Sequence, residues 1–254
     1  MAEIVLVHSF RGGTGKSNTT ANLSAAIACS GKRVAVIDTD VQSPGIHILF
    51  GMQQIDPEFT LNQYLWGNCP LDKAAYDVSP PLVKQNDGSL FLVPSASDAA
   101  HITRILHEGY DVRLLKKGFL KLIETLDLDY ILVDTHPGLN EETLLCIAVA
   151  SRLLVILRPD HQDIQGTAVM VDLARKLKVP KIHLVVNRLL PQSNVEQVRQ
   201  QVESKYQAPV AGVLPNCEEM MQLASSGLFL LKYPKHPLTQ IYQQMAAQII
   251  EEAS

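Results

Sequence analysis

The chain has 254 residues, 46% of them hydrophobic and 19% charged, which is enough for a substantial core in one large domain. Its formal net charge is −4, from 22 basic and 26 acidic residues, which argues against a general polyanion binder. The four cysteines are far apart and form no C-x-x-C pair, so disulfide and zinc frameworks have little support. No run approaches the ~20 apolar residues of a membrane span, and the N-terminus lacks a signal peptide pattern. We therefore expect a cytoplasmic protein.

Short apolar runs alternate with helical patterns along the whole chain. The predicted strands are 4–8, 33–38, 90–94, 130–134, 152–157, 183–187 and 209–214, and the predicted helices are 17–30, 99–126, 141–150, 165–177, 195–206, 217–225 and 238–252. This order predicts an α/β fold, a doubly wound, mostly parallel sheet with helices on both faces, as a single domain over residues 1–254. Segment 53–89 is interpreted as an elaboration of that domain. Ligands of such sheets bind beyond the carboxyl ends of the strands, so the loops after strands are of most interest.

The first of these loops is rich in glycine and ends in Gly-Lys-Ser. Glycines allow backbone N–H groups to point at phosphate oxygens, Lys16 can reach the terminal phosphates, and the Ser17 hydroxyl can ligate Mg²⁺. The first glycine of the usual nucleotide loop is replaced by Phe10, with Arg11 next to it. We predict a phosphate-binding loop made of Gly12, Gly13, Thr14, Gly15, Lys16, Ser17 and Asn18.

Carboxylates follow two further strands. Asp38 and Asp40 are spaced so that one can hold a metal-bound water while the other orients an attacking water. A solvated acidic turn is the alternative. Asp134 ends another apolar strand, where a carboxylate bonds a Mg²⁺-coordinated water or Ser17. His136, two residues later, is interpreted as structural more readily than as a base.

The last two strand ends carry groups suited to a nucleotide base. Asn187 offers a donor and an acceptor for a purine edge, and Arg188 can stack on its face. Pro215 closes the last strand and can also face the base. A turn-forming role for Asn187 is the alternative that the sequence leaves open.

Taken in order, the loop at 11–17, the Asp38-Thr39-Asp40 triplet and the segment 134–138 resemble the ParA/MinD family of deviant-Walker P-loop ATPases. The resemblance implies ATP and Mg²⁺ as cofactors and a homodimer with ATP sandwiched between its subunits. It implies catalytic roles for Arg11, Lys16, Asp38 and Asp40, of which Asp40 orients water, and metal contacts for Ser17, Asp38 and Asp134. The family has lysine where this chain has Arg11, and that lysine touches the partner's nucleotide.

Arginine at that position keeps a permanent charge and adds a planar fork for phosphate oxygens. We therefore expect Arg11 to act as an arginine finger across the dimer. The alternative is a pairing of Arg11 with a local carboxylate. His136 is a second departure, since many relatives carry proline there.

The resemblance further implies that the dimer positions a cargo such as a plasmid, a chromosome or a microcompartment. MinD-like members end in a basic amphipathic helix, whereas segment 238–252 contains no Lys or Arg, so we expect no stable membrane association. We expect nucleoid association through non-specific DNA binding, as in ParA-like or carboxysome-positioning McdA-type members, and an adaptor protein that stimulates hydrolysis. The basic rows at 104–121 and 175–181 would serve DNA binding if they converge, and are solvated helix faces otherwise. The remaining alternatives are a scaffold with vestigial turnover and a MinD-like regulator of division-site placement.

Overall fold

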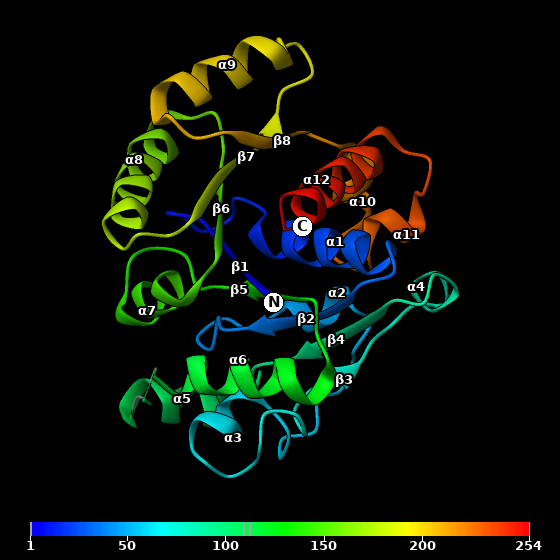
Figure 1. Ribbon diagram of the computed structural model, residues 1–254, viewed down its shortest axis with the longest axis vertical. Helices are drawn as coiled ribbons and strands as arrows, with labels where there is room; N and C mark the ends of the chain where they lie inside the picture. The colour runs from blue at the N-terminus through cyan, green and yellow to red at the C-terminus, as the bar shows by residue number, and fades with distance from the viewer. Residues whose placement is uncertain (1, 109, 112, 254) are drawn as a thin grey trace.

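The computed structural model describes residues 2–108, 110, 111 and 113–253, and in these residues eight strands form one sheet (Figure 1). The strand order is β3-β4-β2-β5-β1-β6-β7-β8, with every neighbouring pair parallel except β3–β4. The strands are β1 (Glu3–His8), β2 (Arg33–Asp38), β3 (Tyr76–Asp77), β4 (Ser89–Val93), β5 (Tyr130–Asp134), β6 (Arg152–Leu157), β7 (Lys181–Leu189) and β8 (Val210–Pro215). The predicted doubly wound, mostly parallel sheet is confirmed.

Helices cover both faces of the sheet. One face carries α1 (Lys16–Ala28), α2 (Ile46–Leu49), α4 (Pro81–Gln85), α10 (Glu218–Leu223), α11 (Phe229–Lys232) and α12 (Pro237–Ala253). The other carries α3 (Leu61–Leu65), α5 (Ala99–Glu108), α6 (Arg113–Leu126), α7 (Glu141–Val149), α8 (His161–Lys176) and α9 (Val195–Tyr206). The central strands are therefore shielded from solvent on both sides.

Successive residues of a strand supply two separate hydrophobic cores. In β1, Ile4 and Leu6 pack with the α6–α8 side, whereas Val5 and Val7 pack with the α1–α12 side. Side chains alternate across a sheet, so a strand buried on both faces needs apolar residues at every position. This explains why the strands read as continuous apolar runs.

The structure corrects some predicted boundaries. The single helix expected at 99–126 is two helices, and residues 109 and 112 between them lie outside the described part. The Asp111 carboxylate accepts the Arg113 N–H at 3.0 Å, at the beginning of the second helix. Helix α8 begins four residues earlier than expected because Asp160 caps it, accepting from the N–H groups of Gln162 and Asp163. The elaboration at 53–89 contains α3, α4 and the antiparallel edge strand β3.

A buried charge cluster joins the sheet to the last helix at the edge opposite the carboxyl ends. Arg152, at the start of β6, is fully buried, and its guanidinium donates to Glu3 of β1 at 3.1 Å and to Glu252 of α12. His183 of β7 lies 3.3 Å from Glu252. The cluster thus ties β1, β6, β7 and α12 together.

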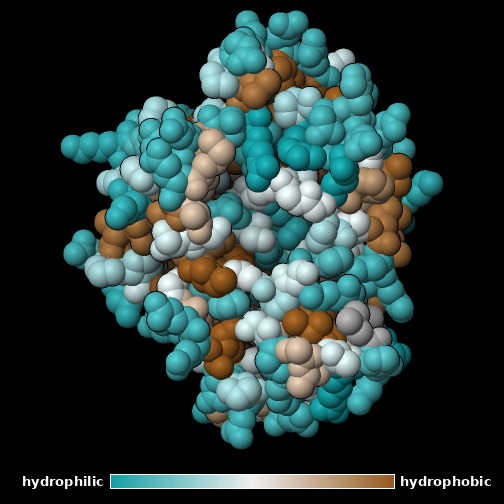
Figure 2. All heavy atoms as spheres, turned by 180° about the vertical axis from the view of Figure 1, so that it is seen from behind, coloured by the Kyte–Doolittle hydropathy of each residue, from teal (hydrophilic) through white to brown (hydrophobic). Residues whose placement is uncertain are grey.

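Helix α12 packs on α1 and β8 through buried side chains that include Tyr242, Met245 and Ile249. No helix in the described ranges is both long enough and apolar enough to cross a bilayer. The face seen in Figure 2 is mostly hydrophilic, with hydrophobic side chains in small separate patches.

Candidate functional site

Two adjoining cavities open where the strands end at their carboxyl edge. The first, of about 420 Å³, is lined by the loop after β1 together with Asp40, Ser43, His136, Pro137 and Arg188. The second, of about 300 Å³, is lined mainly by Asn187, Arg188, Pro215, Asn216, Cys217, Met220, Met221 and Tyr242. Gly15, Asn18 and Arg188 border both, so the two form one continuous site.

The glycine-rich loop after β1 needs its glycines for backbone geometry and for space. Gly13 and Gly15 have φ of 73° and 90°, in the left-handed region that disfavours other residues. A Cβ on Gly15 would lie 2.3 Å from Nδ2 of Asn187, so a larger residue would displace that amide. Among the described residues, the N–H groups of Gly12, Gly13, Thr14 and Gly15 have no hydrogen-bond acceptor. The loop therefore presents free donors at the start of a 13-residue helix, an arrangement that suits an anion.

Phe10, which replaces the first glycine of the usual pattern, anchors the loop from outside. A Cβ on Gly166 of α8 would lie only 2.0 Å from Cδ1 of the Phe10 ring. The ring therefore occupies the space that the glycine leaves on α8. The departure in sequence has a packing role next to Arg11.

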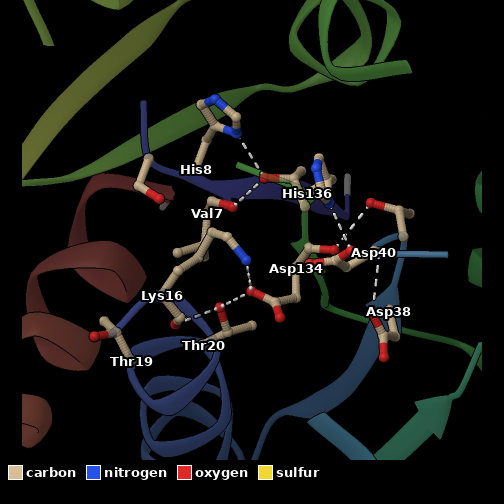
Figure 3. Close-up of polar contacts among 12 residues, drawn as sticks. Val7, His8, Lys16, Thr19, Thr20, Asp38, Asp40, Asp134 and His136 are labelled. Atoms are coloured by element: carbon tan, nitrogen blue, oxygen red, sulfur yellow. Dashed lines mark hydrogen bonds and ion pairs between the residues drawn. The ribbon is translucent and has the colours of Figure 1, made fainter. Parts of the chain in front are cut away.

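Lys16, which lines the first cavity, forms a buried ion pair with Asp134 (Figure 3). Lys16 Nζ lies 3.2 Å from Oδ1 of Asp134, and the Thr20 hydroxyl donates to the same oxygen at 3.1 Å. Their side chains are 7% and 2% exposed. Ser17 lines the same cavity one residue further along α1. The structure thus pairs Lys16 with Asp134, and the metal contacts predicted for Ser17 and Asp134 stay a prediction.

The two carboxylates after β2 occupy different environments. Asp38 is fully buried, and its two oxygens accept the N–H groups of Asp40 and Gly45 at 3.1 and 3.3 Å. Burial, together with the nearby charges of Asp134 and Asp40, raises the pKa of Asp38 well above its usual value. Asp40 instead lines the first cavity, where Oδ1 accepts from Ser43 N–H at 3.0 Å and lies 2.8 Å from Nδ1 of His136. Asp40 is therefore placed to act on a group bound in the cavity. Asp38 instead holds the backbone of the loop after β2 through the N–H groups of Asp40 and Gly45.

Hydrogen bonds hold the end of β5 and the residues after it to the ends of the neighbouring strands β2 and β1. Both the N–H and the hydroxyl of Thr39 donate to the Asp134 carbonyl, at 2.8 and 2.9 Å. The Thr135 hydroxyl donates to the Val7 carbonyl and lies 2.6 Å from Nδ1 of His8. Burial and the Lys16 charge lower the pKa of His8 to about 3, so this imidazole is neutral and donates from Nδ1. These contacts fix the strand ends independently of any ligand.

Arg11 is half exposed and faces carboxylates of its own subunit. Its Nη1 lies 3.8 Å from Asp163 and 4.0 Å from Asp160, at the start of α8. Both carboxylates are held more closely by Arg158, at 3.0 and 3.1 Å. The local carboxylate that the sequence leaves open as an alternative partner for Arg11 is therefore present, at distances longer than a hydrogen bond.

Asn187 and Arg188 lie where β7 ends in an irregular register against β8. The Asn187 amide donates to the Thr14 carbonyl at 2.7 Å, and its oxygen accepts the Arg188 N–H at 2.8 Å. Arg188 has a φ of 57° and borders both cavities, and Pro215 lines the second. Asn187 thus holds the glycine-rich loop in this structure, and its predicted contact with a base stays a prediction.

A thiol, a carboxylate and an imidazole meet beside the second cavity. The Cys217 thiol donates to Glu219 at 3.2 Å, and Nε2 of His236 lies 3.7 Å from Glu219 and 4.0 Å from Cys217. These separations resemble the edges of a tetrahedral metal site. However, Nδ1 of His236 accepts the Leu238 N–H at 3.0 Å, which places the proton of the neutral ring on Nε2. The nitrogen that faces the cluster is therefore a donor, so the cluster is a hydrogen-bonded cap for α12.

Three residues of the site were not singled out from the sequence. Thr20 lies one helical turn after Lys16, a spacing that would have identified it. Thr39 lies between the two aspartates, and its contact depends on the pairing of β2 with β5. Asp163 is nearly fully buried beside Arg158, far from the motifs along the chain.

Comparison with known proteins points to one family. The ParA family model, described as the NUBPL iron-transfer P-loop NTPase, matches residues 1–250. An uncharacterized ATP-binding protein of Methanocaldococcus jannaschii is 27% identical over 251 residues, which cover 98% of this chain and 88% of the relative. The structure of the cell division ATPase MinD of Pyrococcus furiosus superposes with a TM-score of 0.84 at 22% identity, covering 99% of this chain and all of the other. The septum site-determining protein MinD of Pyrococcus horikoshii, complexed with Mg-ADP, gives 0.81 at 23% identity, covering 100% and 98%.

Proposed function

The chain belongs to the ParA family of P-loop NTPases, and we propose that it is an ATP hydrolase that works as a nucleotide-gated homodimer. In this proposal, residues 1–254 form one ATPase domain, and the ATP-bound dimer positions a cargo inside the cell. The observation that carries the proposal is the glycine-rich loop, whose free N–H groups face the same cavity as Lys16 and Asp40.

The residues present suit a bound nucleoside triphosphate. The N–H donors of the glycine-rich loop and the N-terminal end of α1 would hold phosphate oxygens. The second cavity adjoins this loop, and its lining suits a base. Ser17 and Asp134 would hold Mg²⁺, which supplies charge neutralisation to the phosphates when bound. Support for this assignment comes from the M. jannaschii relative, named as ATP-binding, and from the P. horikoshii MinD, complexed with Mg-ADP.

In hydrolysis, positioning and electrostatics carry the rate. Lys16 would exchange the Asp134 carboxylate for a phosphate oxygen, and Asp134 would keep the hydrogen bond from the Thr20 hydroxyl. Asp40, which lines the same cavity, orients the attacking water. Asp38 stays buried and keeps Asp40 in place through the Asp40 N–H.

Arg11 links ATP to dimer formation in this proposal. Its contacts with Asp160 and Asp163 are long and partly exposed, so the guanidinium can leave them for a phosphate of the partner's ATP. An Arg11→Ala protein is expected to bind ATP as a monomer. A variant that dimerises with ATP and hydrolyses it normally would contradict this role.

Non-specific DNA is the matrix that we propose for the ATP-bound dimer. Lys116, Lys117, Lys176 and Lys178 are exposed and form no ion pair within the described ranges, which leaves their charge available to phosphates. In contrast, Arg104, Arg113 and Arg175 are engaged by nearby groups. An adaptor protein that accelerates hydrolysis would release the dimer from DNA.

A second candidate is a MinD-like regulator of division-site placement, which the likeness to MinD structures supports. Co-sedimentation of an Asp40→Ala hydrolysis trap with DNA, in ATP and in ADP, tests the first candidate. We expect ATP-dependent binding that weakens steeply with salt. Equal binding in both nucleotides, or none, would refute it, and ATP-dependent binding to anionic vesicles in its place would favour the second. Absence of phosphate release in every condition would leave a nucleotide-gated scaffold.

A further inference from the structure

We propose that His136 is a positioning residue for hydrolysis, which holds the Asp40 carboxylate in the orientation that acts on water. The inference rests on the proposed ATPase function and assigns a role to a residue that lies in the loop after β5. His136 acts across the cavity on the loop after β2.

The contact itself is short and sheltered. Nδ1 of His136 lies 2.8 Å from Oδ1 of Asp40, with side chains 29% and 13% exposed (Figure 3). A carboxylate oxygen only accepts, so Nδ1 is the donor. The Ser43 N–H donates to the same oxygen at 3.0 Å.

These two donors distinguish the two oxygens of Asp40. Oδ1 is occupied by Ser43 and His136, whereas Oδ2 has no hydrogen-bond donor in the part of the chain that the structure describes. Because Asp40 lines the first cavity, Oδ2 is the oxygen left to accept a proton of water there. A single N–H from Ser43 would hold Oδ1 but would leave the plane of the carboxylate free to turn.

The backbone around His136 is held by other contacts. Thr39 donates twice to the Asp134 carbonyl, and the Gly138 N–H donates to the Ser9 carbonyl at 3.1 Å. Removal of the imidazole would therefore leave the strand ends and the glycine-rich loop in place. The expected defect is confined to the orientation of Asp40, so it should appear in turnover and not in ATP binding.

Three substitutions separate positioning from direct proton transfer. The amide nitrogen of asparagine takes the place of Nδ1, the amide of glutamine reaches toward Nε2, and alanine removes both. Steady-state phosphate release over a range of ATP concentrations gives kcat and the KM for ATP of wild type, His136→Ala, His136→Asn and His136→Gln. His107→Ala, at an exposed histidine of α5, is the matched control.

We expect kcat to fall about 10- to 100-fold in the alanine and glutamine variants, with KM within about twofold. The asparagine variant should recover turnover to within about fivefold of wild type, and the control should match wild type. Equal loss in His136→Asn and His136→Ala would overturn the proposal in favour of a direct role for Nε2. Unchanged turnover in all three would overturn it as well. If wild type itself releases no phosphate while binding ATP, the proposed ATPase function fails, which is a distinct result.

Discussion

Replacement of Arg152 by methionine should strongly destabilise the fold without touching the site. The guanidinium is fully buried, and it bonds Glu3, which is only 7% exposed, and Glu252. Methionine fills much of the stem volume but leaves the Glu3 carboxylate buried without its main partner. Breaking a buried ion pair in this way costs about 3–5 kcal/mol. Since Glu252 is one-third exposed and regains water, we expect about 3 kcal/mol here.

Urea unfolding at pH 7 measures this change, as a midpoint lowered by about 1–3 M for an m of ordinary size. The double variant Arg152→Met/Glu3→Gln is the control, because it also removes the Glu3 charge that the single variant leaves buried without a partner. We expect it to be more stable than Arg152→Met. A loss below about 1 kcal/mol in the single variant, or strictly additive losses, would refute the reasoning. ATP affinity of the folded protein should stay unchanged, since the cluster lies at the opposite edge of the sheet from the cavities.

Two further predictions concern the glycine-rich loop and acid stability. Gly15→Ala should weaken ATP binding at least about tenfold by calorimetry, because its Cβ displaces the Asn187 amide, while Gly51→Ala, which has a similar φ of 76° in open space, should leave binding unchanged. Equal effects of the two would contradict the crowding argument. Burial of Glu252 is outweighed by hydrogen bonds from Gln248 and Arg152 and by the charge of His183, and its pKa falls to about 2. The resulting stabilisation is complete above the ordinary pKa of 4.5 and is lost as the pH falls toward about 2. Allowing for exposure, it amounts to about 1–2 kcal/mol, and Glu252→Gln should remove this part of the acid dependence in urea titrations.

The sheet was predictable because its strands are buried on both faces. Continuous apolar runs such as 4–7 and 131–133 leave little choice of structure, and their alternation with helices sets the topology. The short elements α2, α3, α4, α11 and β3 were not predicted, since four- or five-residue helices and a two-residue strand carry no periodicity. The break near residue 110 was missed because the helical pattern continues on both sides of it.

The motifs of the candidate site and their order along the chain were predictable from the sequence. The side-chain contacts between those motifs were not. The proximity of Lys16 and Asp134 follows from two strands that end at the same edge of the sheet. The link between His136 and Asp40 depends on which loop faces which across the cavity, and no local pattern encodes that. No local pattern predicts the contact of Asn187 either, because its amide donates to the Thr14 carbonyl, 173 residues away in the chain.

The bond from Asn187 to the Thr14 carbonyl has a mechanical consequence. It fastens the end of β7 to the loop after β1, so one residue spans the border between the two cavities. A displacement of the β7 end by a group in the second cavity is transmitted directly to the loop that lines the first. Occupancy of the second cavity and the position of the glycine-rich loop would therefore change together.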